Sequence, residues 1–408
     1  MLKTLRAAGI SCECFEAADD VGGNWYFGAE SGGVYESTHL ISSKRHTEFR
    51  DFPMPDDYPA YPSHRQVLQY LRAYSRHFEL YDDIHFGSRV RSVKPTSDHW
   101  SMTLENQPER ERVFDAVVVA NGHHWSYTVP PLPGEFSGTI IHSRDYRTPD
   151  ILEGRRVLVV GIGSSGSDIA VEAGRHAKAT FVAVRRGKHF VPKFMMGEPN
   201  DASGDWVFRW RIPYWGLRGL AYLPNLFAVG KPGHYGLPTP DHKFMDELPI
   251  PNPEFLNSLG QGTVLVKPAI QGLNGDSVTF VDGSTEKIDV IVFATGYCVG
   301  FPFFDELPFE WVDGVPRLVA RAIHPEHHNL FFAGLFDPTT KMWQLVEHQA
   351  ELFASVLRAN DAGLAWLRKL QSPGKSIGGL PGGRELEIEF YAYRRGLRRI
   401  VRRLSRMQ

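Results

Sequence analysis

A glycine pattern in the middle of the chain constrains the fold more than any other feature. Gly161, Gly163 and Gly166 form G-x-G-x-x-G, with an apolar run before them and a helical pattern after them. In such a strand–turn–helix unit the first glycine allows a tight turn, the second lets a pyrophosphate approach the backbone, and the third lets helix and strand pack closely. The free N–H groups of the helix then attract the phosphates. We therefore expect Gly161, Gly163, Ser165 and Gly166 to bind a dinucleotide.

The next strand indicates which dinucleotide binds there. A site for NAD has an acidic residue about 20 residues further on, whereas a site for NADP has an arginine nearby for the 2′-phosphate. Here Arg185 and Arg186 follow the apolar run 179–184, and no acid stands beside them. Two solvated arginines at a strand end are the alternative interpretation. We expect Arg185 and Arg186 to select NADPH.

The beginning of the chain reads as part of a second dinucleotide unit. A short amphipathic helix precedes a strand ending at Glu16, the place of a ribose-binding acid, and the turn after it contains Gly22, Gly23 and Trp25. Counting back about 20 residues from Glu16 puts the glycine-rich loop of this unit before Met1. We therefore expect the first strand and the loop to be missing, through a misassigned start, a fragment or a real loss. A generic strand and turn is the alternative.

Two strand ends repeat one plan. Residues 115–122 and 289–296 both read Asp, four apolar residues, Ala, Asn or Thr, and Gly, which places Thr295 and Gly296 at the end of a buried strand. Ligands of open α/β sheets bind at such strand ends. Apolar runs that alternate with helical patterns predict an α/β fold with parallel strands. Residues 195–260, rich in Pro, Gly and aromatics, are expected to be an irregular insertion.

Composition excludes several classes of protein. The net charge of the 408 residues is −2, so nothing in the total indicates a nucleic-acid partner. Three cysteines rule out a disulfide framework and favour a reducing compartment, so we expect a cytoplasmic protein. No apolar run approaches the roughly 18 residues that a membrane span needs. The cluster His324, His327 and His328 lacks regular helical ligand spacing, so we expect no metal site.

The C-terminal segment differs from the rest in charge. Residues 391–408 hold seven arginines and no acid, with apolar residues on the opposite helical face. A basic amphipathic helix can lie on an anionic membrane, so peripheral membrane contact is one hypothesis. A terminal helix docked on its own domain explains the same pattern. The oligomeric state is not predicted by the sequence.

Three further motifs stand out in the sequence. Residues 136–146 read F-x-G-x-x-x-H-x-x-x-Y, with His142 and Tyr146 at its end, residues 22–25 are Gly-Gly-Asn-Trp, and residues 293–297 are Phe-Ala-Thr-Gly-Tyr. These motifs resemble the fingerprint F-x-G-x-x-x-H-x-x-x-Y/F, the GG-x-W turn and the FATGY strand end of the flavin-containing monooxygenases, class B flavoproteins related to the Baeyer–Villiger monooxygenases. The resemblance implies two Rossmann-like lobes, with an FAD lobe at 1–147 and 288–408 and an NADPH lobe at 148–287 inserted between its halves. His142 and Tyr146 would link the lobes and help to position NADP(H).

The resemblance also implies an activity. NADPH would reduce FAD, O₂ would give a C4a-(hydro)peroxyflavin, and one oxygen atom would pass to a nucleophilic nitrogen or sulfur of a small organic substrate. The cofactors carry the hard chemistry, so no catalytic triad is expected. At Ile41 the family has an asparagine, and isoleucine has no hydrogen-bonding group to replace it. Baeyer–Villiger oxidation of ketones, or a non-catalytic NADP(H)-binding protein that has lost tight FAD binding, are the alternatives.

Overall fold

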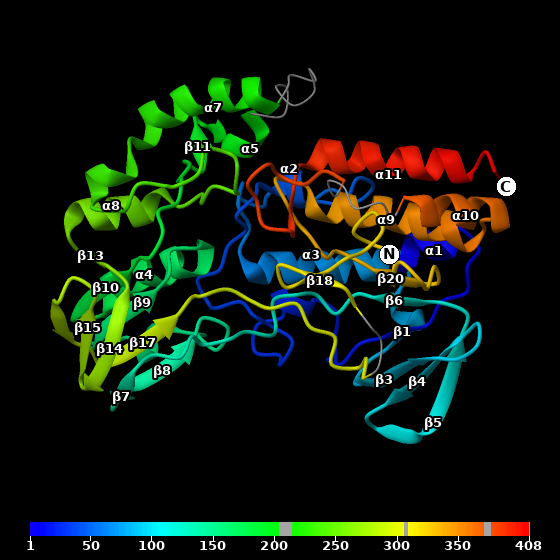
Figure 1. Ribbon diagram of the computed structural model, residues 1–408, viewed down its shortest axis with the longest axis horizontal. Coiled ribbons are helices and arrows are strands. Elements are labelled where there is room, and N and C mark those ends of the chain that lie inside the picture. Colours follow the sequence, from blue (N-terminus) through cyan, green and yellow to red (C-terminus); the bar gives the residue numbers. More distant parts are fainter. Residues whose placement is uncertain (204–213, 306–308, 371–376, 408) are drawn as a thin grey trace. The chain divides into compact units, whose positions relative to one another are not determined.

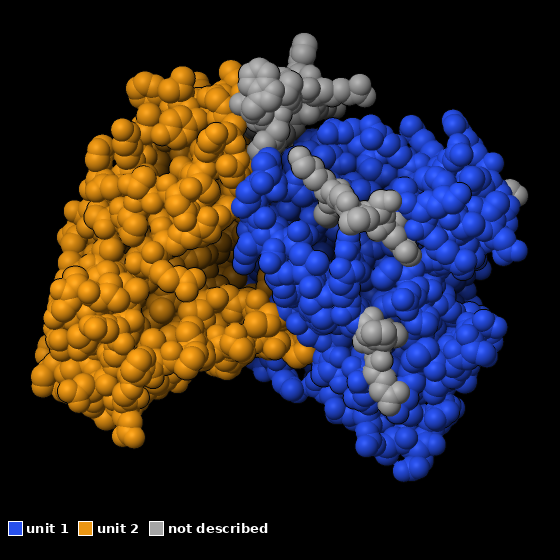
Figure 2. Space-filling model, in the orientation of Figure 1, with its two compact units in different colours: residues 1–32, 42–123, 299–408 blue, residues 33–41, 124–298 orange. Residues whose placement is uncertain are grey.

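The computed structural model describes residues 1–203, 214–305, 309–370 and 377–407. They form two compact units (Figure 2). Unit 1 consists of residues 1–32, 42–123 and 299–408, and unit 2 of residues 33–41 and 124–298. These bounds differ from the predicted lobes, because the strands at 139–142 and 290–293 pair within the sheet of unit 2. The assignment of one cofactor to each lobe stays a prediction.

Unit 2 is built on a five-stranded parallel sheet. Its strand order is β13 (Leu265–Lys267), β10 (Ala179–Ala183), β9 (Arg156–Val160), β17 (Val290–Phe293) and β8 (Thr139–His142). The burial of β9, β10 and β17 on both faces explains why they read as continuous apolar runs. The sequence therefore predicted this part of the α/β fold correctly.

Each face of this sheet has its own cover. On one face, Val157, Val159 and Val292 pack with helices α4 (Ser164–His176) and α8 (Pro253–Gln261). On the other face, Leu158 and Ile291 pack against a four-stranded sheet. The order of that second sheet is β16 (Thr285–Lys287), β15 (Ser277–Phe280), β14 (Ile270–Gly275) and β7 (Gly134–Phe136). The alternation of side chains along each strand thus fills two separate cores.

The predicted irregular insertion at 195–260 is more regular than its composition suggests. It contains the end of the hairpin of β11 (Phe194–Met195) and β12 (Glu198–Pro199), and the helices α5 (Asn200–Ser203), α7 (Tyr214–Val229), η4 (Pro232–Tyr235) and α8. Helix α7 contains Pro224 and two glycines, which hide its helical period. Residues 204–213 of this prediction lie outside the described residues.

The parallel strands described in unit 1 form separate pairs. Strand β1 (Cys14–Phe15) pairs with β2 (Ile84–His85), and β6 (Val117–Val119) pairs with β20 (Leu330–Phe332). A three-stranded antiparallel sheet of β3 (Val90–Pro95), β4 (Trp100–Leu104) and β5 (Gln107–Phe114) adds a further layer. Short pairs complete the described strands, namely β18 (Trp311–Val312) with β19 (Val315–Pro316) and β21 (Asp337–Pro338) with β22 (Glu387–Ile388).

Several helices contribute buried side chains to unit 1. Helix α3 (His64–His77) begins at the predicted N-cap, Ser63, which forms a capping box with Gln66. The others are α1 (Leu2–Ala7), η1 (Gly23–Trp25), α2 (Lys44–Thr47), η2 (Tyr81–Asp83), α9 (Met342–Leu357), α10 (Asp361–Lys369) and α11 (Phe390–Leu404). In unit 2, η3 (Pro149–Ile151) follows β8, the strand that ends at His142.

Helix α11 is docked on its own unit. It runs beside α9 (Figure 1), and its apolar side chains, among them Tyr393, Leu397 and Leu404, are buried. Its arginines Arg395, Arg398, Arg399, Arg402 and Arg403 are exposed on the opposite face. An apolar face that is already buried cannot insert into a bilayer, so membrane contact through the exposed arginines stays a prediction. Among the described residues, no helix combines the length and the apolar character needed to cross a membrane.

Candidate dinucleotide sites and their strand-end turns

The glycine turn of unit 2 has the geometry of a phosphate-binding turn. Gly161 has φ +103°, a value that favours glycine, and a Cβ on Gly166 would lie 2.2 Å from the Gly161 carbonyl oxygen. By contrast, a Cβ on Gly163 would meet no atom within 4 Å. Gly163 is also the N-cap of α4, whose first turn contains the half-buried Ser165 and receives no side-chain cap. The open N–H groups and the free space before Gly163 fit a pyrophosphate.

The predicted residues at 295 and 296 lie at the same edge of the sheet. Strand β17 is the neighbour of β9, and the Ala294 N–H donates to the Val160 carbonyl at 2.9 Å. Thr295 Oγ1 donates to the Thr128 carbonyl at 3.3 Å, and Gly296 has φ +91°. The structure therefore brings Thr295 and Gly296 next to the turn at Gly161, although more than a hundred residues separate them in the sequence.

The fingerprint histidine follows on the next strand. His142 ends β8, in register with Phe293 of β17, and its ring stacks on Tyr127 with a centroid distance of 3.9 Å. Only 2% of His142 is exposed, and burial lowers the pKa of the imidazole below its usual value. The ring is therefore neutral at pH 7. A neutral imidazole suits a residue that positions a ligand more than one that supplies a positive charge.

The fingerprint tyrosine is held by the dinucleotide helix. The Tyr146 hydroxyl donates to Glu172 of α4 at 2.6 Å. One turn earlier on the same helix face, Asp168 accepts from the Tyr35 hydroxyl at 2.8 Å and from Asn252 Nδ2 at 2.7 Å. Hydrogen bonds from Tyr35, Tyr146 and Asn252, which lie in three separate segments, thus hold the helix that begins at the glycine turn. The predicted link between the two lobes stays a prediction.

The two predicted arginines have different surroundings. Arg186 donates from Nε to both carboxylate oxygens of Asp241 at 2.7 Å, and its Nη2 lies 2.6 Å from Glu247 Oε1. Arg185 is exposed, and its side chain makes no hydrogen bond or ion pair among the described residues. Sequence reasoning missed Asp241 and Glu247, since no spacing rule connects them with a strand end more than fifty residues away.

In unit 1 the predicted residues lie around the end of β1. Glu16 follows this strand, and its Oε1 accepts from the Ala18 N–H at 2.9 Å. Gly22 and Gly23 both have positive φ, and Trp25 ends the short helix η1. The turn thus has the backbone form expected of a glycine turn beside a ligand, with a carboxylate at the neighbouring strand end.

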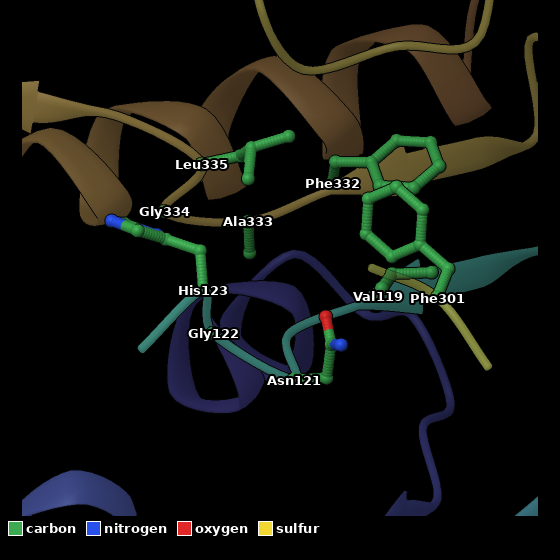
Figure 3. A pocket seen from close by; sticks show the side chains of 9 residues that line it. All are labelled: Val119, Asn121, Gly122, His123, Phe301, Phe332, Ala333, Gly334 and Leu335. Atoms are coloured by element: carbon green, nitrogen blue, oxygen red, sulfur yellow. The ribbon is translucent and has the colours of Figure 1, made fainter. Parts of the chain in front are cut away.

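A hollow lies at the carboxyl ends of β6 and β20 in unit 1. It is a small hollow that opens to solvent, and Figure 3 shows its walls. Its lining residues come from the ends of β6 and β20 and from the segment after 298: Val119, Asn121, Gly122, His123, Phe301, Phe332, Ala333, Gly334 and Leu335. His123 is buried, and its Nε2 lies 3.1 Å from Asp337 Oδ1. This repeated strand end therefore borders a hollow, as its position in the α/β sheet predicts.

The histidine cluster at 324–328 organises a turn. His324 is buried, and its Nδ1 accepts from the N–H groups of Glu326 and His327 at 3.2 Å. His328 Nε2 accepts from Arg368 Nε at 3.0 Å. These bonds give His324 and His328 a structural role in the turn.

Comparison with known proteins identifies the family. The family model described as flavin-binding monooxygenase-like matches residues 2–365. The chain is 34% identical over 384 residues to dimethylaniline monooxygenase [N-oxide-forming] 2 of Oryctolagus cuniculus, covering 88% of this chain and 70% of the relative. The chain therefore belongs to the flavin-containing monooxygenase family, and it is a flavin-dependent monooxygenase by class.

Solved structures show the same fold. An oxidised steroid monooxygenase bound to NADP superposes with a TM-score of 0.70 at 17% identity, covering 99% of this chain and 95% of that chain. A cyclohexanone-bound cyclohexanone monooxygenase gives 0.70 at 18% identity, with 99% and 95% covered. The predicted fold class, an α/β fold with two Rossmann-like lobes, is confirmed.

Proposed function

We propose that this chain transfers one oxygen atom from O₂ to a nucleophilic nitrogen or sulfur of a small organic substrate, with FAD and NADPH as its cofactors. The observation that carries the proposal is the open glycine turn of unit 2, in a chain whose relative of 34% identity is named for forming N-oxides. A bound flavin supplies the redox chemistry that activates O₂. The protein has to bind, orient and shield it.

Unit 2 offers the residues for NADPH. The N–H groups that follow Gly163 would bind the pyrophosphate, with Ser165 beside them in the first turn of α4. Thr295, Gly296 and the neutral His142 line the neighbouring strand ends, where the nicotinamide half would lie. Arg185 stands at the end of β10, the position for the adenosine ribose.

Unit 1 offers the residues for FAD. Glu16 would accept a hydrogen bond from a ribose hydroxyl, and Gly22, Gly23 and Trp25 form the turn beside it. Apolar side chains, among them Phe301, Phe332 and Leu335, line the hollow at the ends of β6 and β20 and would help to keep water away from a flavin bound at this edge of unit 1. Exclusion of water matters because premature water entry releases hydrogen peroxide in place of product.

The test is direct. The purified chain, with FAD added, should be yellow with absorbance near ~450 nm, and should oxidise NADPH in the presence of O₂ and of an amine or a thioether. Mass spectrometry should find the N-oxide or S-oxide, with one ¹⁸O atom from ¹⁸O₂. A chain that stays colourless with FAD and consumes no NADPH would refute the proposal and favour a non-catalytic NADP(H)-binding protein.

Oxidation of ketones is a second candidate, because the fold also matches cyclohexanone monooxygenase. Incubation with cyclohexanone should then yield a lactone, whereas the first proposal predicts that amines and thioethers are the better substrates.

Ile41, with 53% of its surface exposed, stands where the family has an asparagine. The variant Ile41→Asn should therefore lower hydrogen peroxide release if this position has weakened the shielding of the flavin.

A cytoplasmic location stays a proposal from the three free cysteines, and fractionation of cells would test it.

A further inference from the structure

A side chain of helix α9 sets the backbone of the turn that follows β20. Gly334 lines the hollow (Figure 3) and has φ +70°, and its N–H donates to Gln349 Oε1 at 2.8 Å. The N–H of the preceding residue, Ala333, donates to the Val119 carbonyl at 2.8 Å. The Phe336 N–H closes the turn by donating to the Gly334 carbonyl at 2.9 Å. Strand β6 therefore holds one side of the turn, and Gln349 holds the other.

Gln349 is fully buried, and both ends of its amide have a partner. Its Nε2 donates to the Tyr393 hydroxyl at 3.0 Å. The direction of these bonds is fixed, because a backbone N–H can only donate, so Oε1 has to face Gly334 and Nε2 has to face Tyr393. An apolar side chain would fill this place in the core without the cost of burying an amide. The amide therefore serves the two bonds and not the packing.

Tyr393 of α11 continues this chain of hydrogen bonds. Its side chain is fully buried, and its hydroxyl donates to the Ala320 carbonyl at 2.9 Å. Burial raises the pKa of the Tyr393 phenol, so the hydroxyl keeps the proton that it donates. Ala320 has φ +53°, a left-handed conformation that alanine rarely adopts. Three bonds in series thus connect Ala320, through α11 and α9, to the turn at Gly334.

The C-terminal segment also holds the chain just after this turn. Strand β22 pairs in parallel with β21, which begins three residues after Gly334. The Asp337 N–H donates to the Leu386 carbonyl at 2.7 Å. Residues 386–393 therefore hold this region in two ways, directly by strand pairing and indirectly through Tyr393.

We propose that Gln349 and Tyr393 are positioning residues that keep the turn 333–335 in the conformation that receives the flavin of FAD. This inference rests on the proposed function, because it assumes that FAD binds at the strand ends of unit 1. The hollow leaves one side of the turn without packing, so the shape of the turn depends on the bonds at its other side. The buried face of α11 thereby has a role in cofactor binding that is separate from its exposed arginines.

Binding of FAD to the full chain, followed by quenching of flavin fluorescence, tests the proposal. Gln349→Met keeps the size of the side chain and removes both bonds, and it should raise the Kd for FAD about 10-fold. Tyr393→Phe removes only the hydroxyl and should raise the Kd about 3-fold, because Gly334 keeps its own bond. The double variant should match Gln349→Met within about 2-fold, because the two residues act in series.

Two further variants separate positioning from a simple loss of stability. Gln349→Glu keeps an acceptor for the Gly334 N–H in either protonation state, so it should bind FAD within about 3-fold of the original chain. Ile400 is buried on α11 and makes no side-chain hydrogen bond. Ile400→Val is therefore the matched control, which should lower the unfolding temperature and leave the Kd for FAD unchanged. Thermal unfolding shows that each variant is folded, and NADP⁺ binding should be the same in all of them.

Unchanged FAD binding in Gln349→Met, with a lower unfolding temperature, would make Gln349 a core residue only and overturn the proposal. Additive effects of the two single changes in the double variant would also overturn it, as would weaker FAD binding in Ile400→Val or a parallel loss of NADP⁺ binding. An original chain that binds no FAD overturns the proposed function, and this inference with it. Binding of FAD by the original chain that no variant alters overturns the inference alone.

Discussion

The two units use the same strand-end plan in different sheets. In unit 2, β17 ends in Ala-Thr-Gly and lies between β9 and β8, with every residue of the strand buried. In unit 1, β6 ends in Ala-Asn-Gly but pairs with β20 alone, and only its last residue is buried. The repeated sequence therefore does not guarantee a repeated environment. Unit 2 presents a complete set of neighbouring strand ends, whereas the strand end of unit 1 borders a hollow.

The two strand ends therefore differ in how ordered they are before a ligand binds. A central strand has hydrogen-bond partners and packed side chains on both sides, so its turn is rigid before any ligand binds. A strand with one partner leaves polar backbone groups that a ligand can satisfy. We therefore expect the dinucleotide turn of unit 2 to be preorganised, and the strand ends of unit 1 to gain order when FAD binds.

The largest expected effect is the difference between Gly166→Ala in unit 2 and Gly122→Ala in unit 1. Gly166→Ala would place a Cβ 2.2 Å from a backbone oxygen, and should cost about 3 kcal/mol or more of unfolding free energy and abolish NADP⁺ binding. Gly122→Ala meets no atom within 4 Å and should cost about 1 kcal/mol, from its φ of +71°. Urea unfolding measures both. Equal costs would contradict the difference between the turns.

Cofactor binding should affect the two units unequally. FAD at a hundred times its dissociation constant should stabilise the folded state by about 2.7 kcal/mol. Hydrogen exchange should slow mainly at β6 and β20 with FAD, and mainly at the first turn of α4 with NADP⁺. The second change should be the smaller one, because that turn is already ordered. Equal protection of β6 by either cofactor would contradict this assignment of cofactors to units.

The smallest effect concerns the exposed face of α11. Replacing Arg398, Arg399, Arg402 and Arg403 by Gln leaves the buried face intact, so the unfolding free energy should change by less than about 0.5 kcal/mol. If these arginines contact membranes, the variant should sediment less with anionic liposomes than the original chain. Equal sedimentation would refute membrane contact. Deleting the helix is a poorer test, because it would expose the core beneath α11.

The site of unit 2 could be predicted where its residues are adjacent in sequence. The spacing from Gly161 to Gly166 and the strand ending before Arg185 are local signals, and the structure places them at one edge of the sheet. The partners Asp241, Glu247 and Glu172 could not be predicted, because their contacts arise only when distant segments meet.

Unit 1 could be predicted less completely. The cap at Ser63 and the apolar face that follows it predict helix α3. Short apolar runs predict the strands at 14–15 and 117–119. The bounds of the units could not be predicted, since strand pairing decides them and pairing has no local signal. The helix at 214–229 could not be predicted for another reason, because its two glycines and its proline are typical of loops.

The path of the chain has a consequence for how this protein can be dissected. Residues 33–41 leave unit 1 and return to it, so the backbone passes from one unit to the other four times. A fragment of residues 124–298 would lack Tyr35, whose hydroxyl is a partner of Asp168. Neither unit can therefore be excised as one continuous gene segment. A separable nucleotide-binding fragment would need residues 33–41 supplied in trans or joined to it by a linker, as in a split protein.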